Sequence, residues 1–362
     1  MKGKIVYLYA FDVANEINTK TLTEILRSDA SPLEISTDHT FPKDIPLYKP
    51  LSVEVSDLKI TYQGKEISAK INIYEVGCIS IYFNIEFETD NLANLQQYHA
   101  PALDDKRKLD EVAISLCKKT IQDIKTSLIQ PSEQIFEPEA YTIFCVTNLD
   151  KENISTANDW FQGYKKQIAE LVTESKPNIL SQQQIDETLK INLSYSNQEL
   201  TIIDWDSAFI VDLTGYVEDT IYVLELANLQ LEEYKIMDYR LDNYLNKAYD
   251  DVKNKKIGLF NFNYNTLRNL RTLRVDVTKL NDEVTHITKF FGDWYLARVY
   301  MGAREKFHLD KWRNSVEERL SQLDALYSVA HSEISSAKML WLEFIIVVFF
   351  AIDLIALFFG GK

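Results

Sequence analysis

The sequence contains few residues that could crosslink the chain or bind a metal. It has three cysteines and five histidines in 362 residues. Cys78, Cys117 and Cys145 are odd in number, far apart and set among apolar residues, which predicts buried thiols in a reducing compartment rather than disulfides. No two histidines have the i, i+4 spacing that places two ligands on one helix face. We therefore expect no metal and no other cofactor.

The sequence also lacks the motifs of common enzyme classes. A Gly-rich phosphate loop, a Gly-x-Ser-x-Gly elbow and a Cys-x-x-Cys pair are all missing. The formal net charge of -15 argues against general nucleic-acid binding, so no direct DNA binding is expected. The apolar run from Ile5 to Phe11 is too short for a signal peptide and predicts a first strand. These observations favour a non-enzymatic protein that stays in the compartment where it is made.

Residues 1–213 show a mixed pattern that predicts a soluble α+β domain. Apolar residues alternate with mostly polar ones from Ile71 to Phe87, with an interruption near Gly77 that suggests a bulge or bend. Gln63-Gly64-Lys65 predicts a hairpin turn, in which Gly64 supplies a positive φ. Further predicted elements are helices at 103–129 and 157–173 and strands at 141–147, 191–195, 200–205 and 208–211.

Residues 214–338 predict long helices, because glycine and proline almost vanish and apolar residues take helical spacing. Helices are expected at 216–253 and 264–291, followed by a third helical run that leads into the last segment. The third run repeats apolar residues with four-three alternation, which is typical of a coiled-coil stalk. Its seam consists of Val316, Leu320, Leu323, Tyr327, Ala330, Ile334, Ala337 and Trp341. The seam predicts a homo-oligomer, although an antiparallel hairpin within one chain would use the same residues.

Residues 339–359 predict one C-terminal transmembrane helix. The run from Met339 to Phe359 spans roughly 31 Å at 1.5 Å per residue, which matches the hydrocarbon thickness of a bilayer. We expect a single-pass protein of the inner, cytoplasmic membrane with its N-terminal domain in the cytoplasm. Glu343 and Asp353 lie within this run, where acids are costly and often functional. For Asp353, packing against a partner, proton or ion handling and the absence of any specific role all stay open.

Two further groups of charged residues are candidates for a site. Asp204 and Asp206 flank Trp205 and suggest either a strand-end turn or a pair of catalytic carboxylates, of which the turn is the simpler interpretation. Arg268, Arg271 and Arg274 recur every third residue along the second helix. They predict either a salt-bridged, solvated face or a surface for RNA, anionic lipid or an acidic partner.

The C-terminal half resembles the family named after the meiotic nuclear division protein, in the form of a bacterial-type member. The resemblance is carried by 342–346 (Leu-Glu-Phe-Ile-Ile), by the second acid Asp353 and by the aromatic-rich stretch 290–295, and 203–205 is similar to a strand of that family's α/β domain. In that family Glu is more usual than Asp at the position of Asp353, and Trp is more usual than Phe at that of Phe344.

The resemblance implies an oligomeric inner-membrane scaffold without enzymatic activity. Its mitochondrial members hold ribosomes near the membrane, so the translation machinery is one expected partner. The alternative is a subunit of an oligomeric ion-conducting complex, because the architecture distantly resembles two-helix magnesium channels. The chain shows neither their second membrane helix nor their Gly-Met-Asn loop. We thus expect a self-associating scaffold, anchored in a lipid bilayer, that binds a protein partner.

Overall fold

The fold is described from a computed structural model of the chain. It describes residues 1–19, 22, 30–32, 50–55, 58–132, 134–149, 156–213, 217–253, 273–281 and 294–359. The chain forms two compact units. The first unit contains Met1–Tyr234 and Asp282–Lys311, and the second contains Lys235–Asn281 and Trp312–Lys362. The boundary between them falls inside helix α5 (Val217–Lys253).

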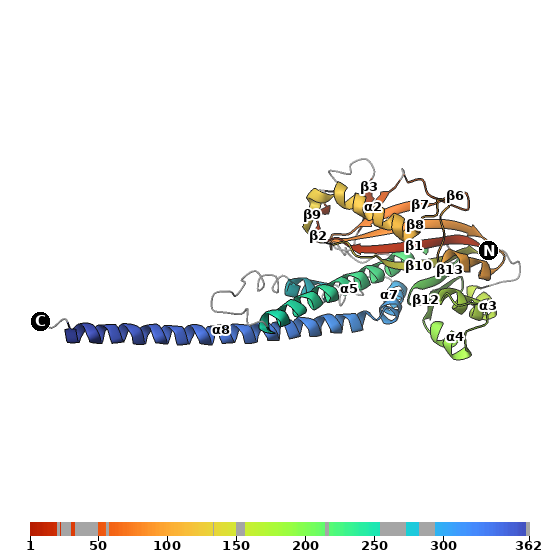
Figure 1. Ribbon diagram of the computed structural model, residues 1–362. Coiled ribbons are helices and arrows are strands. Elements are labelled where there is room, and N and C mark those ends of the chain that lie inside the picture. The colour runs from red at the N-terminus through yellow and green to blue at the C-terminus, as the bar shows by residue number, and fades with distance from the viewer. Residues whose placement is uncertain are drawn as a thin grey trace. The chain divides into compact units, whose positions relative to one another are not determined.

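The first unit is an α+β domain built on a large mixed sheet (Figure 1). The described strands form a nine-stranded sheet in the order β11-β12-β13-β10-β1-β8-β7-β4-β3. Neighbouring strands are antiparallel except for β10 and β13, which are parallel. The strands are β1 (Lys2–Asp12), β3 (Ala30–Pro32), β4 (Leu51–Glu54), β7 (Ser68–Ile73), β8 (Cys78–Glu88), β10 (Glu139–Asn148), β11 (Asn192–Leu193), β12 (Glu199–Ile203) and β13 (Ser207–Asp212).

Two short antiparallel pairs accompany this sheet, and glycine determines two of the turns. β2 (Ala14–Ile17) pairs with β9 (Leu128–Pro131), and β5 (Thr61–Tyr62) pairs with β6 (Lys65–Glu66). The hairpin turn predicted at Gln63-Gly64 is confirmed, because Gly64 has a φ of 74°. Gly77 belongs to the turn that joins β7 to β8. A Cβ atom there would lie 1.9 Å from the carbonyl oxygen of Ala14, so no larger residue fits without a backbone shift.

Short helices follow the strands and begin with side-chain caps. Asn91 caps the 3-10 helix η2 (Leu92–Tyr98), Thr156 caps α3 (Ala157–Val172) and Ser181 caps α4 (Gln182–Thr188). Helix α2 (Leu109–Asp123) begins later than the predicted Leu103. The cause is Asp104, whose carboxylate accepts hydrogen bonds from two backbone N–H groups of the 63–64 turn, each 2.9 Å long. These bonds hold the preceding segment in a turn.

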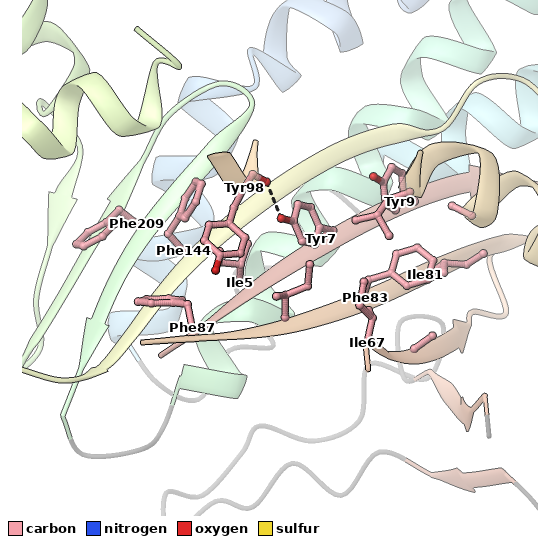
Figure 2. Packing of buried hydrophobic residues seen from close by; sticks show 14 of the residues in the cluster. Ile5, Tyr7, Tyr9, Ile67, Ile81, Phe83, Phe87, Tyr98, Phe144 and Phe209 are labelled. Carbon is pink, nitrogen blue, oxygen red and sulfur yellow. Dashed lines mark hydrogen bonds between the residues drawn. The ribbon is translucent and has the colours of Figure 1, made fainter. Parts of the chain in front are cut away.

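The two faces of the sheet are covered by different helices. The first face packs against η2, α2 and α3. Figure 2 shows its core, in which aromatic and aliphatic side chains of several strands meet and the Tyr7 hydroxyl donates to the Tyr98 carbonyl oxygen. The largest contributors include Ile5, Tyr7, Tyr9, Ile81, Phe83, Phe87, Phe144 and Phe209. Alternation along β1, β8 and β10 turns every second side chain into this apolar layer.

The second face of the sheet packs against the N-terminal part of α5 and against α7 (Trp294–Lys306). Asn228 on α5 donates a 3.1 Å hydrogen bond to the carbonyl oxygen of Glu139. Tyr295 on α7 shares a 3.0 Å hydrogen bond with Thr201 of β12. Cys145 also lies under this layer. All three cysteines are buried and free, which confirms the predicted thiols, and burial raises the pKa of Cys145 to about 12.

The second unit is helical and uses part of the predicted seam within one chain. It contains the end of α5, a helix at 273–281 and most of α8 (Leu309–Phe359). Val316, Leu323 and Tyr327 of the seam are buried. The apolar side chains buried with them in this unit are Ile236, Met237, Leu241, Leu245, Ala248, Leu273, Val277 and Leu280. The intramolecular alternative therefore describes this part of the seam.

Polar contacts align the helices of the second unit. Arg319 on α8 pairs with Asp238 of α5 at 2.7 Å and with Asp242. Arg274 pairs with Asp324, and Asn281 donates to Glu317 at 2.7 Å. From the first pair to the second, the residue number rises on the 273–281 helix and falls on α8. The two helices are therefore antiparallel. Leu320 is half-buried and Trp341 is exposed, whereas the side chains of Ala330, Ile334 and Ala337 lie outside the described residues.

The prediction of a transmembrane helix at 339–359 is wrong. Within the residues that the structure describes, no helix is both long enough and apolar enough to cross a membrane. The run belongs to helix α8, and its side chains from Met339 to Ile355 are exposed. Glu343 and Asp353 lie within that stretch and are exposed in the chain.

This finding corrects every prediction that depended on the membrane helix. The single-pass architecture, the inner-membrane location, the membrane-anchored scaffold and the ion-conducting alternative are all wrong on the same ground. Contact with a lipid bilayer, self-association and a ribosome-associated partner were separate expectations. They stay predictions, although the expected contact with a bilayer was based mainly on the transmembrane helix.

Candidate functional site

Polar side chains gather on the second face of the sheet because of strand register. Glu54 of β4 lies opposite Lys70 of β7, which in turn lies opposite Tyr82 of β8. One step along the same face, Ser52, Asn72 and Ser80 form a second row across the same three strands. Residues directly opposite in an antiparallel pair share a face and have neighbouring Cβ atoms. The register therefore places two polar rows beneath α5.

Helix α5 buries one carboxylate against these rows. Glu225 is 1% exposed, and its Oε1 atom accepts a 3.0 Å hydrogen bond from the Asn72 side-chain amide. The Tyr82 hydroxyl donates to Oε2 of the same carboxylate. The Ser52 hydroxyl donates to Oδ1 of Asn72 at 2.6 Å, which fixes the orientation of that amide. A chain of directed hydrogen bonds thus links three strands to the helix.

Burial determines the protonation of this cluster. Desolvation raises the pKa of Glu225, and the hydrogen bond from Tyr82, the nearby Tyr74 hydroxyl, the charge of Lys70 and the hydrogen bond from Asn72 oppose that rise. Burial and the neighbouring carboxylate raise the pKa of Tyr82 well above its ordinary value, so its hydroxyl keeps its proton and acts as the donor. The buried Tyr74 hydroxyl lies close to the carboxylate as well, but has no hydrogen-bond partner of good geometry.

A cavity of about 440 Å³ lies directly beside the cluster. Tyr82 lines the cavity and also binds Glu225, so this one side chain separates the open space from the buried carboxylate. The volume falls in the range of small-molecule sites, about 300–1,000 Å³. Strands β1, β4, β7 and β8, the β6 hairpin strand and helix α5 all contribute to the wall, through Lys4, Val6, Glu54, Val55, Leu58, Glu66, Ile67, Ser68, Ala69, Lys70, Tyr82, Asn84, Glu218 and Ile221.

The charged groups of the wall differ in how they are neutralised. Lys4 forms an ion pair with Glu218 of α5. The ammonium group of Lys70 lies 4.5 Å from the centroid of the Tyr82 ring, a cation–π contact. Among the described residues, no ion pair is formed by Lys70, Glu54 or Glu66. One ammonium group and two carboxylates therefore face the cavity without forming an ion pair within the described chain.

The sequence-predicted candidates lie elsewhere. Asp204 and Asp206 belong to the hairpin turn between β12 and β13, where the Asp204 N–H donates to the Ser207 carbonyl oxygen at 2.9 Å. The turn interpretation is thus the structural one, and Asp204 binds Lys306 at 3.0 Å. Arg274 pairs with Asp324 in the second unit, as expected of a salt-bridged face. Arg268 and Arg271 lie outside the described residues, and the residues that line the cavity do not include Glu343 or Asp353.

Sequence reasoning missed Lys70, Tyr82 and Glu225. A signal for Glu225 was present, because it is the one acid in the apolar stretch 221–229 of a helix whose other residues there are buried. An isolated carboxylate in such a stretch requires partners on the facing element. The polar positions of β7 and β8 were visible as alternation, but the pattern alone does not show that a helix covers them.

Comparison with known proteins places the sheet in a family. Residues 2–217 match the family model described as "Uncharacterized protein MJ0711, N-terminal domain". The uncharacterized protein MJ0711 of Methanocaldococcus jannaschii is 23% identical over 297 residues, which cover 82% of this chain and 83% of that protein. No solved structure matches the chain. These descriptions say nothing of the meiotic nuclear division family, so that resemblance stays a prediction. Since the family model matches more than half of the residues, the chain belongs to the MJ0711 N-terminal domain family.

Proposed function

We propose that the N-terminal unit is a binding domain that holds a small polar molecule in the cavity beside Tyr82. One observation carries the proposal: a cavity of about 440 Å³ has a wall in which Lys70, Glu54 and Glu66 form no ion pair within the described chain. Ligand sites combine such a volume with a few convergent polar groups. Charged side chains in a concave site gain more from a bound ligand than those on a convex surface.

The support for binding rather than turnover comes from the residues of the wall. Histidine and cysteine are not among the lining residues that the structure describes. The buried carboxylate beside the cavity, Glu225, is screened from it by the Tyr82 side chain that binds it. We therefore propose a receptor or carrier activity, without a chemical step.

Thermal unfolding of the purified full-length chain with a diverse compound panel tests the proposal. The panel holds free amino acids, dicarboxylates, polyamines, nucleotides and sugars. A true ligand raises the melting temperature, and the shift grows with the logarithm of the ligand concentration above its Kd, because the ligand binds only the folded state. Ser68→Trp, which fills the cavity from β7, should abolish the shift. Gln183→Trp on the exposed surface of α4 is the matched control and should preserve it.

Two results would reject the binding function. The first is a panel in which no compound raises the melting temperature of the unaltered chain. The second is a shift that survives Ser68→Trp undiminished while that variant remains folded by circular dichroism.

A further inference from the structure

The charges around the cavity are segregated by strand. Lys70 extends from β7, whereas Glu54 comes from β4 and Glu66 from β6. Lys4 is already neutralised by Glu218, so it adds no net charge to the wall. A ligand therefore meets one free ammonium group and two free carboxylates. This set of charges is the feature that determines which class of ligand fits.

Lys70 and Glu54 are cross-strand neighbours that do not form an ion pair with each other. The position of Lys70 explains this, because its ammonium group lies over the Tyr82 ring. The hydroxyl of that ring binds the buried Glu225, whose negative charge also attracts Lys70. Within the described chain, Lys70 donates no hydrogen bond. The N–H groups of its ammonium group are thus available to an acceptor that enters the cavity.

We propose that the cavity takes a small zwitterion, an amino acid or a compound with the same pair of charged groups. The ligand's carboxylate binds Lys70, and its ammonium group binds Glu54 and Glu66. A plain anion gains Lys70 but meets two carboxylates of like charge, and a plain cation gains the carboxylates but meets Lys70. Only a ligand with both charges satisfies both sides, which makes the charge pattern a filter. This inference rests on the proposed binding function and adds the ligand class.

Calorimetric titration of the full-length chain tests the ligand class with matched compounds. The twenty common amino acids are titrated first, and the tightest binder is compared with its amide, which lacks the carboxylate, and with its N-acetyl form, which lacks the ammonium group. Each capped form should bind at least tenfold more weakly than the free amino acid. Each capped form loses a charge-assisted hydrogen bond to the cavity wall, which accounts for a loss of this size.

Variants assign each end of the ligand to its partner. Lys70→Met keeps the length and apolar stem of the side chain, and should make the chain bind the amino acid and its amide with equal affinity. The double variant Glu54→Gln, Glu66→Gln should equalise the amino acid and its N-acetyl form. Lys65→Met and Glu86→Gln change exposed charges outside the cavity wall and should leave both tenfold ratios intact.

The ligand class and the binding function fail in different ways. One such result is a dicarboxylate, polyamine or sugar that binds more tightly than every amino acid and no longer binds to Ser68→Trp. That result would overturn the proposal of a zwitterionic ligand but would support the binding function. Equal binding of an amino acid, its amide and its N-acetyl form would also overturn the zwitterion. Complete absence of binding across the whole panel would overturn both.

Discussion

The two faces of the large sheet are made by the same strands, yet they differ in chemistry. On the first face, side chains such as Ile5, Tyr7 and Phe83 form a continuous apolar layer under η2, α2 and α3 (Figure 2). On the second face, Asn72 and Tyr82 meet Glu225 of α5 in a buried polar cluster beside a cavity. Helix α5 would pack on an apolar face at a lower cost in free energy, because burying a carboxylate costs several kcal/mol of lost hydration. A polar cluster that is costly to bury, next to a cavity, therefore favours the second face as the functional one.

The first face should be the more sensitive to loss of volume. Phe83→Ala removes a fully buried ring from the apolar layer and leaves a void. We expect the free energy of unfolding to fall by about 3–5 kcal/mol, measured by urea denaturation. Glu86→Ala, an exposed site on the same strand, is the control and should change stability by about 0.5 kcal/mol or less. A loss below 1 kcal/mol for Phe83→Ala would contradict the assignment of that face as the main core.

The second face should respond to the loss of a single donor. Tyr82→Phe deletes the hydroxyl that donates to Glu225 and leaves the ring in place. We expect a loss of about 1–3 kcal/mol, because the buried carboxylate becomes short of a hydrogen bond. Tyr164→Phe, a tyrosine on α3 away from the cluster, serves as the matched control. Equal effects of the two substitutions would show that the cluster contributes nothing special.

The two faces should also differ in their dependence on pH. Burial raises the folded-state pKa of Glu225 above the ordinary value of 4.5, so ionisation disfavours the folded state. This penalty is absent below about pH 4.5 and complete above the raised pKa. The stability of Glu225→Gln relative to the unaltered chain should therefore increase as pH rises through that window and then become constant. Urea denaturation at a series of pH values measures the difference, and a difference that is flat or falls with pH would contradict the raised pKa.

The smallest expected effect concerns Lys70. Its charge lowers the pKa of Glu225, so Lys70→Met should move the pH window of the preceding comparison upward. Stability at pH 4 should change by only about 0.5 kcal/mol or less, since Lys70 is partly exposed and forms no ion pair with a described residue. The profile of Lys70→Met is compared with that of Lys65→Met. A pH window that stays in place would contradict the claim that the charge of Lys70 lowers the pKa of Glu225.

The local elements of the fold were largely predictable from sequence. The Gln63-Gly64 turn, the strand at 141–147 and the helix at 157–173 all follow from turn chemistry, alternation and helical spacing. The start of α2 was misplaced, because the turn before it depends on Asp104 binding a distant backbone segment. Such long-range contacts leave no local pattern.

The candidate site was not predictable in the same way. Lys70, Tyr82 and Glu225 are separated by up to 155 positions in the numbering and meet only through strand register and the placement of α5. Conversely, the apolar run at 339–359 has a strong local pattern, and it led to a transmembrane prediction that the described helices do not support. A pattern in one segment indicates how hydrophobic that segment is. Which residues it contacts depends on other segments that the fold brings close to it.

The most direct test of the central claim is one calorimetric comparison, in which the tightest-binding amino acid and its amide are titrated into the unaltered chain and into Lys70→Met. The account predicts at least tenfold discrimination by the unaltered chain and none by the variant, because Lys70 is the partner of the ligand's carboxylate. Discrimination of equal size in both proteins would contradict it.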